Sequence, residues 1–213
     1  MEMIEVFLHN GGAGTYLILF SALVFVILGV ERLTALFMRL SYNTDNAVNS
    51  IRSLILSRNY TEALQICNTK ENAPDLNVVK AALLSVESGR EAMRSALGGA
   101  VLEVTHQCEA RLPYLALIAN VATLLGLFGT ITGLIKTFMA IGNADAADKA
   151  RLLSLGISEA MHSTAAGLAV GIAAMIVHTI CASRADAIVG HAQDVGFKVI
   201  TWVEQSERTK TNG

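Results

Sequence analysis

Ionisable and hydroxyl side chains interrupt an otherwise apolar stretch that runs from Gly156 to Arg184. They are Glu159, His162, Ser163, Thr164 and His178. A charged side chain at the centre of a bilayer costs about 3 kcal/mol on insertion scales, so such groups are rare in membrane helices unless they have a role. Carboxylate and imidazole groups can carry protons, and hydroxyl groups can line a hydrated path. The stretch therefore indicates a helix that faces a hydrated interior or a polar partner as well as lipid.

Two Glu-x-x-His pairs, Glu103–His106 and Glu159–His162, match the ligand spacing of di-metal helical bundles. In an antiparallel hairpin, however, residue 159 faces residue 136, whereas residue 103 faces a position far down the partner helix. At about 1.5 Å per residue the two pairs are tens of Å apart, too far to share a metal. Cys67, Cys108 and Cys181 show neither metal nor redox spacing and are expected to be free, buried thiols. We expect no metal and no cofactor.

The composition predicts a membrane protein. Of the 213 residues, 53% are hydrophobic and 16% are charged, whereas soluble domains carry about 25% charged residues. Three apolar runs, 11–30, 112–135 and 152–183, are each long enough to span a bilayer. The first run follows Glu2 and Glu5 rather than basic residues, so we interpret it as a retained anchor and not as a secretory signal.

The distribution of basic residues predicts the orientation, because cytoplasmic loops are enriched in Lys and Arg. No Lys or Arg precedes the first run, whereas many lie between the first and second runs and several follow the third. The N-terminus is therefore predicted outside and the C-terminus in the cytoplasm. The expected segments are an external N-terminus (1–11), transmembrane helix 1 (12–30), a cytoplasmic helical segment (31–111), transmembrane helix 2 (112–141), an external connection (142–155), transmembrane helix 3 (156–183) and a cytoplasmic helical tail (184–213).

The segments outside the membrane are also predicted to be helical, so the expected fold class is all-α. Residues 45–67 have the apolar spacing of short amphipathic helices with a break near 58–60 and Thr61 as a cap, and Pro74 marks a fresh helix start. Ser88 and Glu91 form a capping-box pattern, after which no strong helix breaker precedes Gly142 apart from Pro113, which is expected to kink the helix. The second and third membrane helices should thus extend into a cytoplasmic helical domain.

Threonines and glycines recur on the facing sides of the second and third membrane helices. Thr123, Thr130 and Thr137 repeat every seven residues on one helix, and Thr164, Gly171 and His178 do so on the other. Pairing the two helices as an antiparallel hairpin places Thr130 beside Thr164. It also places Lys136 across from Glu159, where the two can form an ion pair, because burying a pair of opposite charges in a membrane costs less free energy than burying either charge alone. Small residues that permit close helix packing are Gly126, Gly129, Gly133, Gly167 and Gly171.

A purely structural interpretation of these residues is available. Membrane threonines commonly bond their own i−4 carbonyl oxygens, and glycines tighten helix packing. Two polar stripes on adjacent helices, together with ionisable groups, favour instead a hydrated or partner-filled interior. The residues predicted to line this interior or pore are Thr123, Thr130, Thr137, Glu159, His162, Ser163 and Thr164.

Two motifs resemble the MotA/TolQ/ExbB proton-channel family, in particular its ExbB and TolQ branch. The first is ATLLGLFGTITGLIKTF, from Ala122 to Phe138, and the second is GISEAMHSTAAGLAVGIAA, from Gly156 to Ala174. The order and spacing of the motifs, the three helices and the large cytoplasmic insertion agree with this family over nearly the whole chain.

The resemblance implies a pentamer in the bacterial inner membrane, with the N-terminus in the periplasm. Its second and third helices would line a central pore that holds the single transmembrane helices of an ExbD- or TolR-like partner, in two copies, which brings a proton-carrying aspartate. A TonB- or TolA-like protein is a further implied partner. On this chain Thr130 and Thr164 correspond to the pore threonines, and Glu159 to the membrane glutamate. The sequence departs from the family pattern at Thr123 and Ala173, where prolines are frequent, and at Lys136 and His162.

The function expected from these features is that of a proton-channel or motor stator subunit, not an enzyme. Such a subunit couples proton-motive force to mechanical work across the periplasm, as in TonB-dependent uptake, Tol envelope or gliding-type systems. The alternative is a non-conducting oligomeric membrane scaffold, whose function would be insensitive to protonophores. No catalytic Ser/His/Asp set or phosphate loop supports an enzyme, and neither the net charge of −2 nor any motif indicates a nucleic-acid partner.

Overall fold

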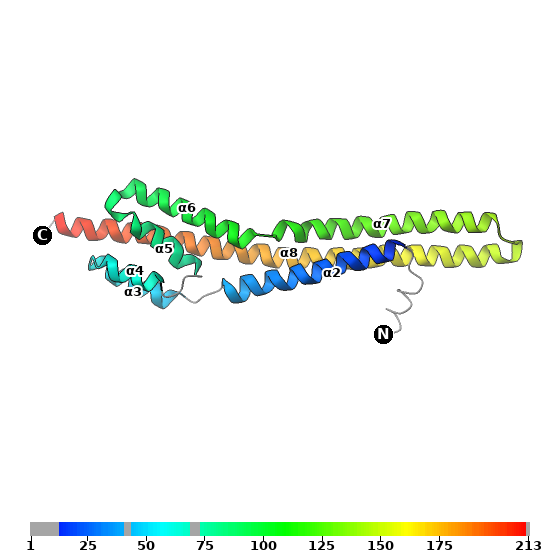
Figure 1. Cartoon of the computed structure of the whole chain (residues 1–213), viewed down its shortest axis with the longest axis horizontal. Coiled ribbons are helices and arrows are strands. Elements are labelled where there is room, and N and C mark those ends of the chain that lie inside the picture. The colour runs from blue at the N-terminus through cyan, green and yellow to red at the C-terminus, as the bar shows by residue number, and fades with distance from the viewer. Residues whose placement is uncertain (1–12, 41–43, 69–72, 212–213) are drawn as a thin grey trace. The chain divides into compact units, whose positions relative to one another are not determined.

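The computed structural model describes residues 13–40, 44–68 and 73–211, and over these ranges the chain is helical and contains no strand, which confirms the all-α fold class (Figure 1). The predicted external segment 1–11 lies outside the described residues. The chain divides into two compact units. We name residues 1–31 and 111–180 the hairpin unit, and residues 32–110 and 181–213 the insert unit.

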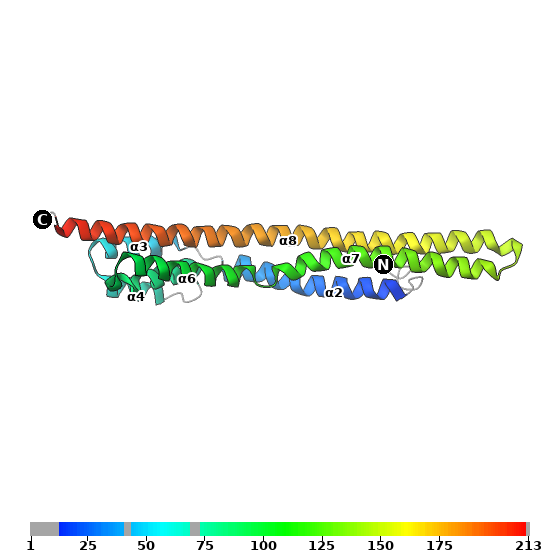
Figure 2. The same cartoon turned by 90° about the horizontal axis from the view of Figure 1, so that it is seen from above.

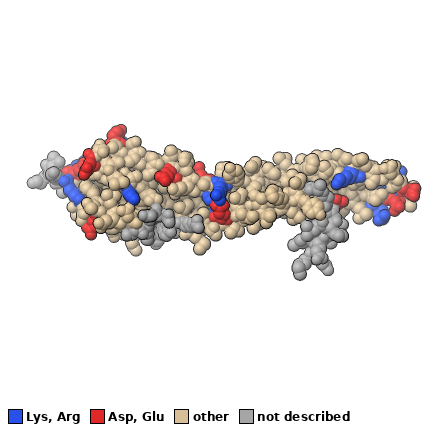
Figure 3. All heavy atoms as spheres, viewed as in Figure 1, with Lys and Arg blue, Asp and Glu red and all other residues tan. Residues whose placement is uncertain are grey.

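Within the described residues, three helical stretches are long and apolar enough to cross a membrane, in agreement with the three predicted spans. They are Thr15–Met38, Arg90–Gly142, which includes both α6 and α7, and Ala146–Arg208. The hairpin unit is built from α2 (Ala13–Thr34), α7 (Leu112–Gly142) and the first part of α8 (Ala146–Thr211). In this unit α2 and α7 run along α8, as the two views of Figures 1 and 2 show. Large apolar side chains such as Phe20, Leu124 and Ile172 are exposed, as a lipid-facing surface requires. Figure 3 shows one face on which a long stretch carries no Lys, Arg, Asp or Glu.

The turn between α7 and α8 is shorter than the sequence suggested. Only residues 143–145 separate the two helices, because α8 already begins at Ala146. The first turns of α8 are rich in strong helix formers, and Arg151 forms an ion pair with Asp148 one turn before it. Most of the predicted connection 142–155 is therefore helical.

The helix that precedes the second membrane span is broken instead of merely kinked. α6 (Arg90–Glu109) ends just before Arg111, whose φ of 64° is left-handed, and α7 starts at Leu112. Pro113 favours the break, because in a continuous helix it could not donate an N–H to the Glu109 carbonyl and its ring would clash with that carbonyl. On the insert-unit side, Arg32 Nη1 donates to the Ala110 carbonyl at 2.6 Å. On the hairpin-unit side, Arg111 pairs with Glu31.

The insert unit holds the short helices that the sequence predicted. They are α3 (Asp45–Leu56), α4 (Tyr60–Asn68), α5 (Pro74–Leu84), the 3-10 turn η2 (Val86–Ser88) and α6; the π-helical turn η1 (Ala35–Arg39) precedes them. α4 is capped by Asn59 and not by Thr61, since the Glu62 N–H donates to Asn59 Oδ1 at 3.4 Å. The predicted capping box at Ser88 does not form, because α6 follows Gly89, whose φ of 91° favours glycine.

The core of the insert unit joins α8 to the inserted helices. Its fully buried side chains include Ile51, Ile55, Leu76, Val79 and Val199. Gly196 of α8 permits the close packing, because a Cβ there would lie 2.6 Å from Leu97 Cδ1 and 2.7 Å from Val78 Cγ1. The guanidinium of Arg52 lies 5.8 Å from the ring centre of Trp202, a cation–π contact between α3 and α8.

The free thiols Cys67 and Cys108 are buried in the insert unit. Burial raises the pKa of each from 9.0 to about 11, because a buried thiolate loses hydration. A shift of two pKa units lowers the reactive thiolate fraction about a hundredfold near pH 8. We expect both cysteines to resist iodoacetamide in the native protein and to react in urea, as peptide mass spectrometry can show. Rapid native labelling of both would contradict the buried core.

The same two thiols predict how stability depends on pH. Because the folded state holds their protons more tightly than the unfolded state does, the free energy of unfolding should fall as the pH rises from 9.0 towards about 11.

Candidate functional site in the membrane hairpin

A pair of threonine hydroxyls joins α7 to α8 within the hairpin unit. Thr130 Oγ1 lies 3.1 Å from Thr164 Oγ1, which is the neighbour that the hairpin register predicted. Thr164 Oγ1 also lies within hydrogen-bonding distance of the Gly126 carbonyl across the helix interface, at 3.1 Å. Both side chains are half-buried in the single chain. The pair is thus a polar contact between two helices whose outer surfaces are largely apolar.

The two hydroxyls have fewer hydrogens to donate than acceptors around them. Thr130 Oγ1 is 2.7 Å from the Leu127 carbonyl and 3.4 Å from that of Gly126, in addition to its contact with Thr164. Each hydroxyl supplies one hydrogen but two acceptor lone pairs. When the hydrogens are given to the carbonyl oxygens, lone pairs on the hydroxyl oxygens remain open. The site can therefore accept a hydrogen bond from a proton-bearing group.

The other threonines of the predicted stripe bond to their own helix. Thr123 Oγ1 donates to the Ala119 carbonyl at 3.0 Å, and Thr137 Oγ1 donates to the Gly133 carbonyl at 2.8 Å. This is the i−4 bonding that the structural interpretation described. Thr137 is also buried, whereas Thr123 is exposed in the single chain. Of the stripe, only Thr130 makes a hydroxyl contact with the facing helix among the hydrogen bonds of the described residues.

Glycines bring the two helix backbones together around the threonine pair. A Cβ on Gly167 would lie 2.5 Å from the Ala122 carbonyl oxygen and 2.7 Å from Gly126 Cα, both backbone atoms. A Cβ on Gly171 would lie 2.5 Å from Thr123 Oγ1. Two further glycines of α7 meet small side chains, Gly129 against Ser163 and Gly133 against Ala160. Every glycine that the sequence singled out for packing lies at this interface.

Ser163 and Glu159 were both predicted to line the polar interior, but they differ in burial. Ser163 is buried against Gly129, so it belongs to the helix interface. Glu159 and His162 are exposed in the single chain, as is Lys136 on α7. His162 Nδ1 lies 2.6 Å from the Ser158 carbonyl, so Nδ1 carries the hydrogen and Nε2 is left as the outer nitrogen. The ion pair between Lys136 and Glu159 stays a prediction.

Two features of the site were missed from the sequence. Gly156 packs against Thr137, and a side chain there would collide with the Thr137 hydroxyl. Thr132 is a further polar residue of α7, but its hydroxyl bonds only to carbonyls of its own helix, at 2.9 and 3.2 Å. The Gly156 contact follows from extending the hairpin register by one more step towards the turn, so the register alone could have found it.

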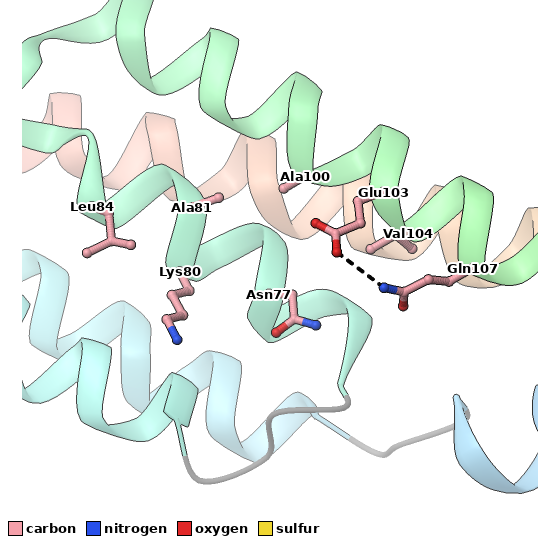
Figure 4. Close-up of a pocket in the computed structure, with 8 residues that line it drawn as sticks. All are labelled: Asn77, Lys80, Ala81, Leu84, Ala100, Glu103, Val104 and Gln107. Atoms are coloured by element: carbon pink, nitrogen blue, oxygen red, sulfur yellow. Dashed lines mark hydrogen bonds between the residues drawn. The ribbon is translucent and has the colours of Figure 1, made fainter.

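The other Glu-x-x-His pair, Glu103–His106, lies in the insert unit. Glu103 lines a groove of about 290 Å³ between α5 and α6, together with Lys80 and Asn77 (Figure 4). Its carboxylate accepts a hydrogen bond of 3.5 Å from Gln107 one turn away. Within the described residues, no three His, Cys, Asp or Glu side chains gather as metal ligands would.

A multi-pass helical membrane protein with a glycine-packed hairpin is the class that this fold and site define. The model of the MotA/TolQ/ExbB proton channel family matches residues 70–194, more than half of the chain. The protein belongs to this family.

Curated relatives confirm the resemblance to the ExbB and TolQ branch. The Tol-Pal system protein TolQ of Haemophilus influenzae is 39% identical over 88 residues, which is 41% of this chain and 37% of TolQ. The biopolymer transport protein ExbB of Salmonella typhimurium is 32% identical over 87 residues, 41% of this chain and 35% of that protein. An ExbB homologue of Methanothermobacter thermautotrophicus is 29% identical over 86% of this chain and 64% of its own length. The matches with TolQ and with the Salmonella ExbB thus span well under half of those relatives.

A solved structure supports the fold. A chain of the Campylobacter jejuni MotAB structure superposes with a TM-score of 0.60 at 15% identity, over 93% of this chain and 79% of that chain. At this level of identity the likeness shows that the two chains share an architecture.

The tight glycine contact generates a stability prediction. We expect Gly167→Ala to destabilise the folded protein by about 1–3 kcal/mol, because the added methyl group meets backbone atoms that cannot rotate away. Gly142→Ala at the end of α7 is the matched control, since nothing lies within 4 Å of a Cβ there. Thermal unfolding of both variants, followed by circular dichroism in detergent, measures the difference. Equal midpoints for the two variants would show that the helices are not packed this closely.

Proposed function

We propose that this protein is the stator subunit of a proton-driven complex in the bacterial inner membrane, and that it turns proton flow into mechanical work across the periplasm. The observation that carries the proposal is the Thr130–Thr164 hydroxyl pair, held between two glycine-packed membrane helices. Lipid cannot use the open lone pairs of these oxygens, whereas a protonated carboxyl group can. Family membership supports the same role.

The carboxyl group is proposed to come from a partner protein. Within the described residues, the predicted spans 12–30, 112–141 and 156–183 contain no aspartate, and their one carboxylic acid is Glu159 on the exposed side of α8. An ExbD- or TolR-like protein with one membrane span and a membrane aspartate would place its acid beside the threonine pair. When the acid is protonated it donates to a threonine oxygen, and when it is ionised it accepts the hydroxyl hydrogens instead. The hydroxyls can thus serve both charge states.

The assembly is proposed to be a pentamer around two copies of that partner. A ring would cover part of the apolar surface of α7 and α8 with neighbouring copies and would turn the Thr130–Thr164 edge towards a central pore. The proposed orientation, N-terminus in the periplasm and C-terminus in the cytoplasm, rests on the distribution of basic residues. The system that the complex drives, whether TonB-type, Tol-type or gliding-type, is set by the partner proteins.

Removal of one hydroxyl tests the proton path. We expect Thr164→Ala, and likewise Glu159→Ala, to reduce proton uptake at least tenfold when the chain is reconstituted with its single-span partner in liposomes containing a pH-sensitive dye. Thr179→Ala is the matched control on the same helix, because the Thr179 hydroxyl is exposed and bonds only to the Met175 carbonyl of its own turn, at 2.8 Å. Normal uptake in both Thr164→Ala and Glu159→Ala, with intact insertion, would favour a non-conducting scaffold.

His162 gives a second test through pH. The Ser158 carbonyl accepts the Nδ1 hydrogen, so the outer nitrogen Nε2 is the atom of this ring that is open to a proton. We expect His162→Leu to shift the pH profile of proton uptake, while His162→Gln, which is polar but does not titrate, gives the same altered profile. A wild-type profile in both variants would exclude His162 from the proton path.

A further inference from the structure

A buried acid in the insert unit binds two other segments through one oxygen atom. Asp75, in the first turn of α5, exposes 6% of its surface. Thr44 Oγ1 donates to Asp75 Oδ2 at 2.5 Å, and His191 Nδ1 lies 3.1 Å from the same oxygen. Thr44 immediately precedes α3, and His191 belongs to α8. The cluster therefore fastens the beginnings of α3 and α5 to the long helix.

The order of the hydrogen bonds excludes a nucleophile relay. The Thr44 hydroxyl donates to the carboxylate and not to the imidazole, so the histidine does not activate it as a base would. Asp75 instead fixes the imidazole with Nδ1–H pointing inward. The outer nitrogen, Nε2, remains the position at which the ring gains or loses a proton.

His191 is open to solvent, while the acid that it touches is not. The side chain of His191 is 51% exposed, whereas that of Asp75 is 9% exposed. The ring lines a cavity of about 420 Å³ between α3 and α8, where the other charged residues are Asp45, Arg52 and Lys198. Asp45 and Asp75 attract a proton to the ring, and Arg52 and Lys198 oppose it. Of these four charged groups, Asp75 is the one that the ring contacts directly, at 3.1 Å.

We propose that the Asp75–His191 contact is a proton-responsive link that tightens the insert on α8 when the surrounding solution becomes acidic. With neutral His191 the contact is a hydrogen bond from imidazole to carboxylate. With protonated His191 it becomes an ion pair, because the Coulomb attraction between imidazolium and carboxylate is added to the hydrogen bond. The link goes beyond the proposed function and needs neither the partner protein nor a proton gradient. In a proton-driven stator it makes the packing of the insert sensitive to the pH on its own side of the membrane.

Amide hydrogen exchange of the full-length protein in lipid nanodiscs tests the link. After correction for the chemical exchange rate, we expect amides of α3 and α5 to exchange about fivefold more slowly near pH 6 than near pH 8, on either side of the usual histidine range. His191→Gln keeps an N–H donor for Asp75 but does not titrate, so the pH difference should disappear. His106→Gln, which removes an exposed histidine from α6, should retain it.

A second measurement covers the case in which His191→Gln does not fold. The ring protons of His191 in the wild-type protein should titrate over the same pH range in which the exchange rates change, as NMR can follow. Equal corrected rates at both pH values, a pH difference that persists in His191→Gln, or a ring that keeps one charge state throughout would each overturn the proposal.

Discussion

The close approach of the α7 and α8 backbones is the constraint on which the membrane hairpin depends. Lipid chains are as apolar as leucine side chains, so membrane helices do not associate through the hydrophobic effect and rely on packing and on polar contacts between helices. Here Gly167 sits against the Ala122 carbonyl and the Gly126 backbone, with no room for a side chain. Only at this separation can the Thr164 hydroxyl reach the Gly126 carbonyl of the facing helix and the Thr130 hydroxyl beside it. The polar site is thus a consequence of the glycine packing.

Periodicity and register predicted much of this arrangement. The three apolar spans follow from length and composition, and the Thr130–Thr164 neighbours follow from pairing two helices across a short turn. The sequence could not separate Ser163 from Glu159, because a hydroxyl fits equally well on a buried or an exposed face, and the choice depends on the small Gly129 opposite. The helix break at Arg111 was also missed: Pro113 indicated a local disturbance, but whether a helix bends or stops there depends on contacts from distant residues such as Arg32.

The insert unit depends on buried polar contacts as well as on its apolar core. Asp75 lies at the start of α5, where a negative charge is favoured by the helix dipole, and it gains hydrogen bonds from Thr44 and His191. No sequence pattern joins these three residues, because they are far apart in the chain and each has an ordinary role in its own segment. Their meeting is set by how the inserted helices fold onto α8, which periodicity alone does not determine.

The contact between Arg52 and Trp202 has a practical consequence. Trp202 is the chain's single tryptophan, and it lies in the insert unit with a guanidinium 5.8 Å from its ring centre. Selectively excited indole emission therefore originates from one known location in α8, far along the sequence from the threonine pair. The molecule carries an intrinsic optical reporter of the α3–α8 contact, free of background from the bilayer-spanning helices. A change in this emission reports a change in the surroundings of Trp202, at the α3–α8 contact.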